Sequence, residues 1–461
     1  MSRPLVFLLV VLAVGAALRL ACMGAEFWLD EIWSWTLAHD APSFLGVLAI
    51  RHDNSHPLNS LWLRLCPASA PLIVLRLPAL LAGLGAIALA AYVARRRGAA
   101  ESVFAGLLVA GCSWTVFASA EARGYSLAVF FAFAALEALW RYLERGSRLS
   151  LAAFWLLSAL GFVSHLTFVH ATIGFVVWSM RRFARETPQS SLRQISAMAL
   201  LHGPVAAFFA VYYLIVVRGM EIGGGPPATV GQIVRDLISL GLGGPEGAWG
   251  WLLVGVAVVL FVGGLTLLAR AKRDVWTFFA AAVVGSPALF LVRPPEYVAE
   301  RYFLISFVFF LLLVAFVLGD LWRRVSLRPL VLSLLVGFLA GNAYQVCAFA
   351  EAGRGEFGEA LAWIADRDSS DPLMVTGDHD FRVRLYTEFY ARRLSLGRVR
   401  YLGGDGNSEA KWILIHLPPD AEESRFVYDG PPYLTERKVY RSRGRASWGW
   451  YVYQITADTP Q

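Results

Sequence analysis

Long apolar stretches follow one another along most of this chain of 461 residues. A helix needs about 20 apolar residues to cross the hydrocarbon core of a bilayer. Stretches near that length lie at residues 4–25, 73–94, 99–119, 124–142, 150–164, 166–180, 194–217, 249–269, 274–292, 302–320 and 328–349. They predict an α-helical polytopic membrane protein of about eleven spans, within a range of roughly 10–13 because two of the stretches are short.

The charge of the chain supports this class and argues against nucleic acid as a partner. Only 16% of the residues are charged, against roughly 25% in soluble proteins. The net charge is +7 at pH 7, but residues 1–349 hold 26 Lys and Arg against 17 Asp and Glu, whereas residues 350–461 hold 15 against 17. The positive excess therefore belongs to the membrane part, where it sets the orientation.

The basic residues between the apolar stretches predict which way the chain is inserted. With eleven spans, all of the basic clusters fall on one side: Arg3, Arg95–Arg97, Arg141/Arg145/Arg148, Arg181/Arg182/Arg185/Arg193, Arg270/Lys272/Arg273 and Arg323/Arg324/Arg328. By the positive-inside rule that side is the cytoplasm. We therefore expect a multi-pass protein of the cell membrane (inner or plasma membrane), with its N-terminus in the cytoplasm and its C-terminus outside. The first stretch is interpreted as an uncleaved span.

Two outer loops are predicted within the membrane domain, residues 1–349. The first, residues 26–71, is expected to form interfacial helices, because a full crossing at 57–71 would turn every later basic cluster outward. The second, residues 218–248, is rich in glycine and proline around an amphipathic piece, Val230–Ile238. It is either a flap over a site or a plain connecting loop.

After Ala350 the pattern changes to that of a small soluble domain, residues 350–461. Residues 357–366 are typical of a helix, and the apolar runs 373–376 and 412–415 are typical of buried strands. We expect an extracytoplasmic α/β domain of ordinary size.

The sequence demands no cofactor. The four cysteines show neither a disulfide framework nor zinc-ligand spacing. No Walker loop and no GxGxxG motif is present, so a nucleotide-binding domain is not expected. A divalent metal near the outer carboxylates stays open, although no ligand spacing requires one.

The first candidate for chemistry is the acidic pair Asp30-Glu31, which follows the first apolar stretch among tryptophans. The indoles favour the headgroup level of the membrane, and an ionisable residue at a membrane boundary is a functional candidate by default. The alternative is structural, since acidic residues also stabilise the first turn of a helix.

Further polar groups fall on the same outer side in the predicted topology. They are the run His52–His56, the run Glu121–Tyr125, His165, and Glu300-Arg301-Tyr302. A carboxylate can take the proton of an acceptor hydroxyl, and a guanidinium can hold a phosphate through its forked donors. Each group also has a plainer interpretation: Arg301 as a paired interfacial residue, His56 as a helix cap, His165 as a core residue, and Glu121–Arg123 as an ion pair.

The ordered set of motifs resembles the GT-C superfamily of membrane glycosyltransferases, in particular the bacterial branch similar to protein O-mannosyltransferases and the lipid A aminoarabinose transferase. The resemblance covers most of residues 1–320. It rests on the Asp30-Glu31 pair, His56-Pro57-Leu58, Leu75–Leu80, Glu121–Leu127, Ser164-His165 and Arg301–Leu304. The family often has His-Pro-Pro where this chain has His56-Pro57-Leu58.

The resemblance implies a GT-C-like fold and a sugar transferase that uses a polyprenyl-phosphate-linked donor on the extracytoplasmic face. It implies Asp30 as general base of an inverting displacement, Glu121 as a second active-site acid and Arg301 as a donor-phosphate contact. Glu31 joins them as a catalytic candidate. The predicted substrate-binding residues are His56, Arg123, Tyr125, His165, Arg301 and Tyr302. The expected acceptor is a glycan, a lipid or a protein.

Two other functions fit parts of the pattern. A surface-polysaccharide ligase or polymerase also uses lipid-linked sugars, but it is normally organised around a large late outer loop, whereas the acids here lie in the first. A transporter or flippase of lipid-linked sugars would place charges at the midplane and show internal repeats, and this sequence shows few such charges and no clear repeat.

Overall fold

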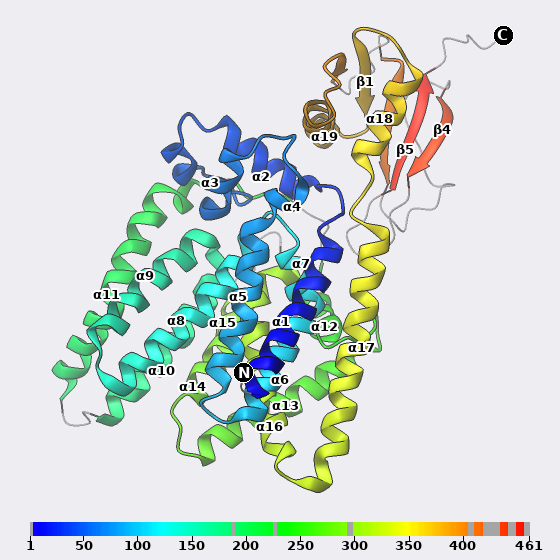
Figure 1. Cartoon of the computed structure of the whole chain (residues 1–461). Helices are drawn as coiled ribbons and strands as arrows, with labels where there is room; N and C mark the ends of the chain where they lie inside the picture. The colour runs from blue at the N-terminus through cyan, green and yellow to red at the C-terminus, as the bar shows by residue number, and fades with distance from the viewer. Residues whose placement is uncertain are drawn as a thin grey trace. The chain divides into compact units, whose positions relative to one another are not determined.

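The computed structural model describes residues 3–186, 190–224, 228–292, 298–403, 410–417, 434–440 and 449–455. The chain is mostly helical, with one small sheet near its C-terminus (Figure 1). It divides into two compact units. The first contains Met1–Leu20, Leu45–Asn59 and Arg76–Val346, and the second contains Ala21–Phe44, Ser60–Leu75 and Cys347–Gln461.

Helices make up the first unit. They are α1 (Arg3–Cys22), η1 (Leu45–Ala49), α5 (Leu77–Ala94), α6 (Ala99–Gly111), α7 (Ser113–Ser119), α8 (Tyr125–Arg145), α9 (Arg148–Ser164), η2 (Leu166–Phe168), α10 (Val169–Glu186), α11 (Ser191–Ile215), η3 (Val217–Gly219), α12 (Val230–Gly241), α13 (Gly250–Arg270), α14 (Trp276–Phe279), the π-helical η4 (Ala280–Gly285), α15 (Ser286–Val292), η5 (Glu300–Phe303), α16 (Leu304–Trp322), η6 (Val325–Leu327) and α17 (Arg328–Ala352).

Several of these helices can cross a membrane. Within the described part of the chain, six are long and apolar enough, and the bent pair α6–α7 raises the number to seven. Three shorter apolar helices lie at Val6–Cys22, Arg148–Ser164 and Trp276–Phe290. The predicted polytopic helical class is confirmed, while the count of about eleven spans and the predicted orientation stay predictions.

A sharp break between α6 and α7 is stabilised by buried polar side chains. The two helices meet at 61°, so the last carbonyls of α6 lose their helical partners. Arg19 donates from Nη1 to the carbonyl of Ala110 at 3.1 Å and from Nη2 to that of Val109 at 3.4 Å. On the other side of the break, Asn342 Oδ1 accepts from the backbone N–H of Ser113 at 2.7 Å. Both side chains are fully buried.

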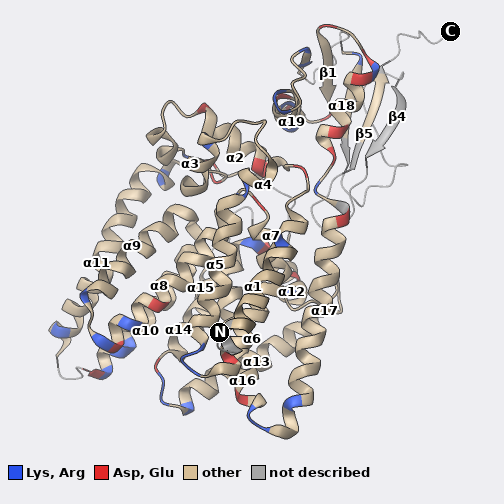
Figure 2. Cartoon of the chain, in the orientation of Figure 1, with Lys and Arg blue, Asp and Glu red and all other residues tan. Residues whose placement is uncertain are grey.

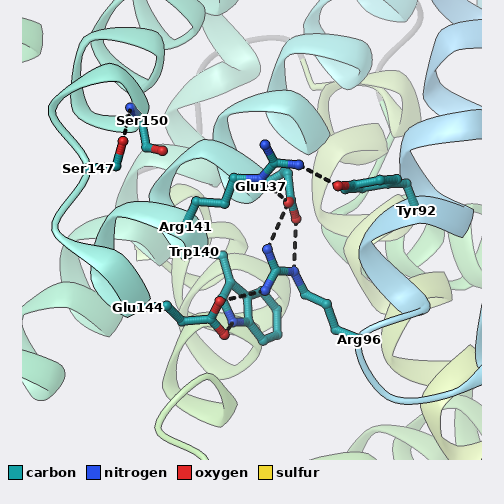
Figure 3. Close-up of polar contacts among 8 residues, drawn as sticks. All are labelled: Tyr92, Arg96, Glu137, Trp140, Arg141, Glu144, Ser147 and Ser150. Atoms are coloured by element: carbon teal, nitrogen blue, oxygen red, sulfur yellow. Dashed lines mark hydrogen bonds and ion pairs between the residues drawn. The ribbon is translucent and has the colours of Figure 1, made fainter.

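The basic end of the first unit carries an ion-pair network (Figure 3). Arg96, just after α5, binds Glu137 of α8 through Nη2–Oε1 at 2.7 Å and Nε–Oε2 at 3.0 Å, and it also binds Glu144 at 2.8 Å. Arg141 binds the same Glu137 carboxylate at 2.6 Å and also contacts Tyr92. These contacts fix the end of α8 against the end of α5.

The other basic clusters lie at this same end. Arg323, after α16, pairs with Glu101 at the start of α6, and Arg185 of α10 pairs with Asp274 at 2.7 Å. Figure 2 shows the blue residues of the bundle concentrated at its lower end in that view. The helices thus bring together basic groups that are far apart in the sequence.

The second unit contains the sheet and its helices. Its elements are α2 (Leu29–Asp40), α3 (Pro57–Leu65, of which residues 57–59 belong to the first unit), α4 (Leu72–Leu75), α18 (Phe357–Arg367), β1 (Leu373–Gly377), α19 (Asp380–Arg393), β2 (Val399–Tyr401), β3 (Trp412–Leu417), β4 (Leu434–Tyr440) and β5 (Gly449–Ile455). The strand order is β2-β1-β3-β5-β4. β1 is parallel to β2 and β3, and β5 is antiparallel to β3 and β4. The predicted helix and the two predicted strands are confirmed.

Residues of the first predicted outer loop pack on this small domain. The Tyr390 hydroxyl donates to the carbonyl of Phe27 at 2.9 Å. Arg393 donates to the carbonyls of Ala68 and Ala70, both at 2.7 Å. Residues 21–44 and 60–75 therefore belong to the same unit as the C-terminal domain, whereas from the sequence they are expected with the membrane domain. The nine-residue helix α3 is too short to cross a bilayer.

Candidate functional site

The acidic pair Asp30-Glu31 lies in the first turn of α2, in the second unit, and its two members differ in environment. Glu31 is fully buried, and its Oε2 accepts a hydrogen bond from the backbone N–H of Trp28 at 3.4 Å. The Glu31 side chain thus accepts a hydrogen bond from the residue before the helix, as the acid of a capping box does. Asp30 is partly exposed. The plainer interpretation, a helix cap, therefore fits Glu31, and Asp30 stays a candidate for chemistry.

The other seven predicted site residues belong to the first unit, where Arg123 is the centre of a buried polar cluster. Arg123 precedes α8 and is 3% exposed. Its Nε donates to His56 Nε2 at 3.1 Å, and its Nη2 donates to Asn54 Oδ1 at 2.7 Å. The guanidinium also lies 5.1 Å from the ring centre of Tyr125. The cluster holds a cation in a fixed orientation, which is the arrangement that binding of an anion requires.

His165 completes the aromatic side of the cluster. Its ring centre lies 4.0 Å from that of Tyr125 and 4.9 Å from that of His56, the latter pair being stacked. His165 lies between α9 and η2, where its Nδ1 accepts from the backbone N–H of Thr167 at 3.1 Å. Three residues that are separate in the sequence, His56, Tyr125 and His165, are thus brought together.

A glycine makes this approach possible. A Cβ atom on Gly124 would lie 1.9 Å from the carbonyl oxygen of Ser164 and 2.9 Å from the Cβ of His56. The first of these neighbours is backbone, which cannot turn away. The turn before α8 is further held by Asn59, whose Nδ2 donates to the carbonyl of Ala122 at 2.5 Å. Glycine at position 124 therefore lets the start of α8 meet the end of α9.

The loop that carries His56 is fixed to the end of α11. Glu221 donates its backbone N–H to the carbonyl of Arg51, and the backbone N–H of Asp53 donates to the carbonyl of Glu221, both at 3.0 Å. The Arg51 side chain donates from Nε to the carbonyl of Ile215 at 2.8 Å. The second predicted outer loop thus contributes a support for the site through Glu221. Its residues 225–227 lie outside the described residues.

The amphipathic piece of that loop is the helix α12, and it is packed. Ile233 and Leu237 lie in the core of the unit, and the Trp114 indole donates to the carbonyl of Leu237 at 3.1 Å. Because α12 is packed into the core, this part of the loop is better interpreted as a connecting segment than as a flap.

Arg301, Tyr302 and Glu121 lie around the same end of the bundle. Arg301 and Tyr302 are partly exposed on η5, at the start of α16. Glu121 is buried in the turn between α7 and α8, where its carbonyl accepts from the N–H of Arg123 at 2.8 Å. α8 and α16 each run from this end of the unit to the basic end, so some 30 Å separates the two ends.

Burial keeps both histidines of the cluster uncharged. It lowers the pKa of His56 and of His165 well below the usual range of imidazole, and the positive charges of Arg123 and Arg301 lower each pKa further. Both residues lie outside the membrane-crossing helices. At neutral pH the cluster therefore contains two permanent cations and two neutral imidazoles.

Across the described residues, no group of three or more His, Cys, Asp and Glu side chains is arranged to hold a metal ion. The cations of the cluster are arginines, whose guanidinium groups form charge-assisted hydrogen bonds with anionic groups.

Comparison with known structures shows which proteins share this fold. No protein-family model and no curated protein matches the sequence. The structure of ArnT from Cupriavidus metallidurans in the apo state is similar to this one with a TM-score of 0.59 and 13% identity over 100% of both chains. ArnT bound to undecaprenyl phosphate gives 0.55 and 14% over 99% of both chains.

An archaeal protein gives the same result. The apo oligosaccharyltransferase of Archaeoglobus fulgidus has a TM-score of 0.55 and 10% identity over 89% of this chain and 69% of its own. Both proteins are GT-C membrane glycosyltransferases. This chain has the GT-C fold. The predicted resemblance is thereby confirmed at the level of the fold.

Within this GT-C fold, some site residues could not be singled out from the sequence. Asn54 orients Arg123, Asn59 holds the turn before α8, and Gly124 allows the approach of two helices. Asn54 belongs to the run His52–His56 and Gly124 to the run Glu121–Tyr125. Only the structure shows that these two members of the runs position Arg123 and the start of α8.

Proposed function

We propose that this chain is a membrane glycosyltransferase that moves a sugar from a polyprenyl-phosphate-linked donor to an acceptor on the extracytoplasmic face. The observation that carries the proposal is the Arg123 cluster: a buried guanidinium oriented by His56 and Asn54, with the charge of Arg301 close by. The GT-C fold and the structure of ArnT with undecaprenyl phosphate support it.

The donor's phosphate is the group that this cluster suits. Guanidinium groups bind phosphate oxygens through forked, charge-assisted hydrogen bonds. A neutral His165 whose Nδ1 accepts a bond carries its proton on Nε2 and so adds a further donor. Tyr125 and Tyr302 supply ring faces and hydroxyls for the sugar. No nucleotide is needed, because a lipid phosphate is itself a leaving group.

The chemistry requires a base for the acceptor hydroxyl, and we assign this role to Asp30. A carboxylate within hydrogen-bond reach can take the proton as the acceptor oxygen attacks the anomeric carbon. Attack opposite to the phosphate inverts that carbon. Arg123 and Arg301 stabilise the charge that develops on the departing phosphate. Glu121 is assigned as a second acid at the site. Glu31 is assigned the role of capping the start of α2, the helix that carries Asp30.

The phosphate assignment is tested by the binding of undecaprenyl phosphate to purified full-length protein in detergent. Arg301→Ala is expected to weaken binding by at least tenfold, because one charge-assisted contact contributes about 1.5–3 kcal/mol. Arg324→Ala, at the basic end, is the matched control and should leave the Kd unchanged. An unchanged Kd for Arg301→Ala would count against the assignment.

A further inference from the structure

His170 is a fully buried polar side chain to which the proposed reaction assigns no role. It lies in the first turn of α10. Its Nδ1 is hydrogen-bonded to the hydroxyl of Ser286, the first residue of α15, and Ser286 is also fully buried. Separating two buried polar groups leaves each without its partner, at a cost in stability. The pair therefore holds α10 to the start of α15.

The segment that carries Ser286 is also held from a second helix. Ser286 directly follows the π-helical η4, and π-helical turns inside helices are frequent at functional sites. The carbonyl of Ala282, within η4, accepts a hydrogen bond from the hydroxyl of Ser306 at 2.7 Å. Ser306 lies in the first turn of α16, directly after η5. The same segment is thus joined to α10 through His170 and to the start of α16 through Ser306.

η5, which carries Arg301, is in contact with this assembly through aromatic rings. It is a single 3₁₀ turn of four residues, and the hydrogen-bond geometry of such turns is poorer than that of an α-helix. The ring centre of its buried residue, Phe303, lies 5.7 Å from that of His170. Phe290 of α15 lies 5.2 Å from His170 and meets Phe303 edge to face at 6.1 Å. Three rings from α10, α15 and η5 therefore form one packed cluster.

The position of η5 matters because of the charge that it carries. Arg301 lies close enough to His56 and His165 for its charge to act on both rings, as the charge of Arg123 does. A guanidinium binds a phosphate through parallel N–H groups, which requires its plane to be fixed. A displacement of about 1 Å at such a group can cost orders of magnitude in function. The contacts of η5 therefore decide whether Arg301 is directed at the phosphate.

We propose that His170 is a positioning residue for the donor phosphate: it holds η5 in the place from which Arg301 binds that phosphate. The ring contact with Phe303 exerts this hold, and the bond with Ser286 sets the direction of the imidazole. The inference rests on the proposed function. His170 acts through Arg301 and takes no part in proton transfer. The alternative is a purely structural pair, which stabilises the bundle without affecting the site.

A double-mutant cycle on the binding of undecaprenyl phosphate to purified full-length protein separates these two roles. His170→Asn removes the ring and keeps an amide that can bind Ser286. In the wild-type background we expect the Kd to rise about fivefold. In the Arg301→Ala background the same substitution should cause no further rise, because the group that it positions is absent. An equal rise in both backgrounds overturns the positioning role, as does an unchanged Kd in the wild-type background.

Ser286→Ala tests the same contact with a smaller change. It removes only the hydroxyl that orients the imidazole, and Ala is at least as favourable as Ser in a helix. We expect the Kd to rise about twofold in the wild-type background and not at all in the Arg301→Ala background. This variant decides the matter if His170→Asn does not fold, and an unchanged Kd would then overturn the inference.

The matched control is a second pair of histidine and serine on α10. Ser179 Oγ lies 2.7 Å from His202 Nε2 of α11, and the His202 ring is edge-on to Phe154. Ser179 lies about 14 Å further along α10 than His170. His202→Asn should lower the Tm and leave the Kd unchanged, whereas a rise in Kd like that of His170→Asn would overturn the inference. Failure of the wild-type protein to bind undecaprenyl phosphate overturns the proposed function, and the inference with it.

Discussion

At the scale of single residues, the site depends on contacts that few other side chains could make. Arg123 is held by two acceptors, His56 Nε2 and Asn54 Oδ1. These two acceptors are two residues apart in one loop, so the loop sets the direction of the guanidinium. The same loop is tied to Glu221, 98 residues beyond Arg123 in the chain.

Arg123→Lys tests the orientation of this group. An ammonium has no planar fork and cannot reach both acceptors and a phosphate at once. We expect the Kd for undecaprenyl phosphate to rise about tenfold or more, with the protein still folded. Binding equal to that of the wild type would show that charge alone matters there.

Gly124→Ala tests the close approach of α8 and α9. The added methyl would overlap the carbonyl oxygen of Ser164, so the start of α8 must shift. We expect a loss of thermal stability together with weaker phosphate binding. The control is Gly255→Ala in α13, where nothing lies within 4 Å of the new Cβ and Ala favours the helix by about 0.5–1 kcal/mol. The account would be contradicted if the two variants behaved alike.

At the scale of elements, broken helices bring polar groups to one end of the bundle. The 61° bend between α6 and α7 lets the chain turn at Glu121–Gly124 into α8. The bend exposes carbonyls that only a buried donor can satisfy, which explains a fully buried arginine, Arg19, inside the first apolar helix.

Arg19→Met tests how much the hydrogen bonds of Arg19 to the bend contribute to the stability of the protein. The methionine fills a similar length but leaves the carbonyls of Val109 and Ala110 without this donor. We expect about 1–3 kcal/mol of destabilisation, seen as a lower Tm of the purified protein. Arg324→Met, at an exposed position, should leave the Tm unchanged; a similar Tm for both would refute the capping role of Arg19.

In the second unit, Glu26 connects the segment after α1 to the start of α18. Its Oε2 accepts from the N–H of Gly358 at 2.8 Å. Burial raises the pKa of Glu26 to about 7, and the hydrogen bond from Gly358 only partly offsets this. Because the folded pKa lies above the unfolded value of about 4.3, the folded state binds more protons between these values, so stability falls as pH rises through this window.

Glu26→Gln removes this titration while keeping an acceptor for Gly358. We expect the Tm of the wild type, measured relative to that of the variant, to decrease from pH 5 to pH 8. A constant difference in Tm over this range would contradict the assignment of the titration to Glu26.

At the scale of the whole molecule, the hydrophobic pattern was sufficient to predict the polytopic helical class and the small α/β domain. The resemblance to the GT-C superfamily, confirmed at the level of the fold, rested instead on the ordered set of short motifs. From the sequence, His56, Arg123, Tyr125 and His165 were expected on one side of the membrane, and the structure shows them in contact with one another. What could not be predicted depends on contacts between distant residues: Asn54 with Arg123, Gly124 with Ser164, and Glu26 with Gly358, 332 residues apart. No local pattern encodes such pairs.

The orientation is also a property of the whole chain, and impermeant thiol labelling of intact cells tests it. Cys347 is the exposed cysteine among the four, so Cys347→Ser provides the background. His379→Cys, in the C-terminal domain, should react from outside, whereas Arg324→Cys, at the basic end, should react only after the membrane is opened. The reverse pattern would contradict the predicted insertion.

The most direct test of the central claim is turnover of polyprenyl-phosphate-linked sugars by the purified chain, with wild type, Asp30→Asn and Glu31→Gln side by side. We expect the wild type to consume one donor of the panel when a suitable acceptor is present. Asp30→Asn should lose at least about a hundredfold in rate, as expected for a missing general base, while Glu31→Gln, which can still cap α2, keeps most of the activity. Full turnover by Asp30→Asn would contradict the assigned base, and consumption of no donor by a folded wild-type protein would contradict the proposed glycosyl transfer itself.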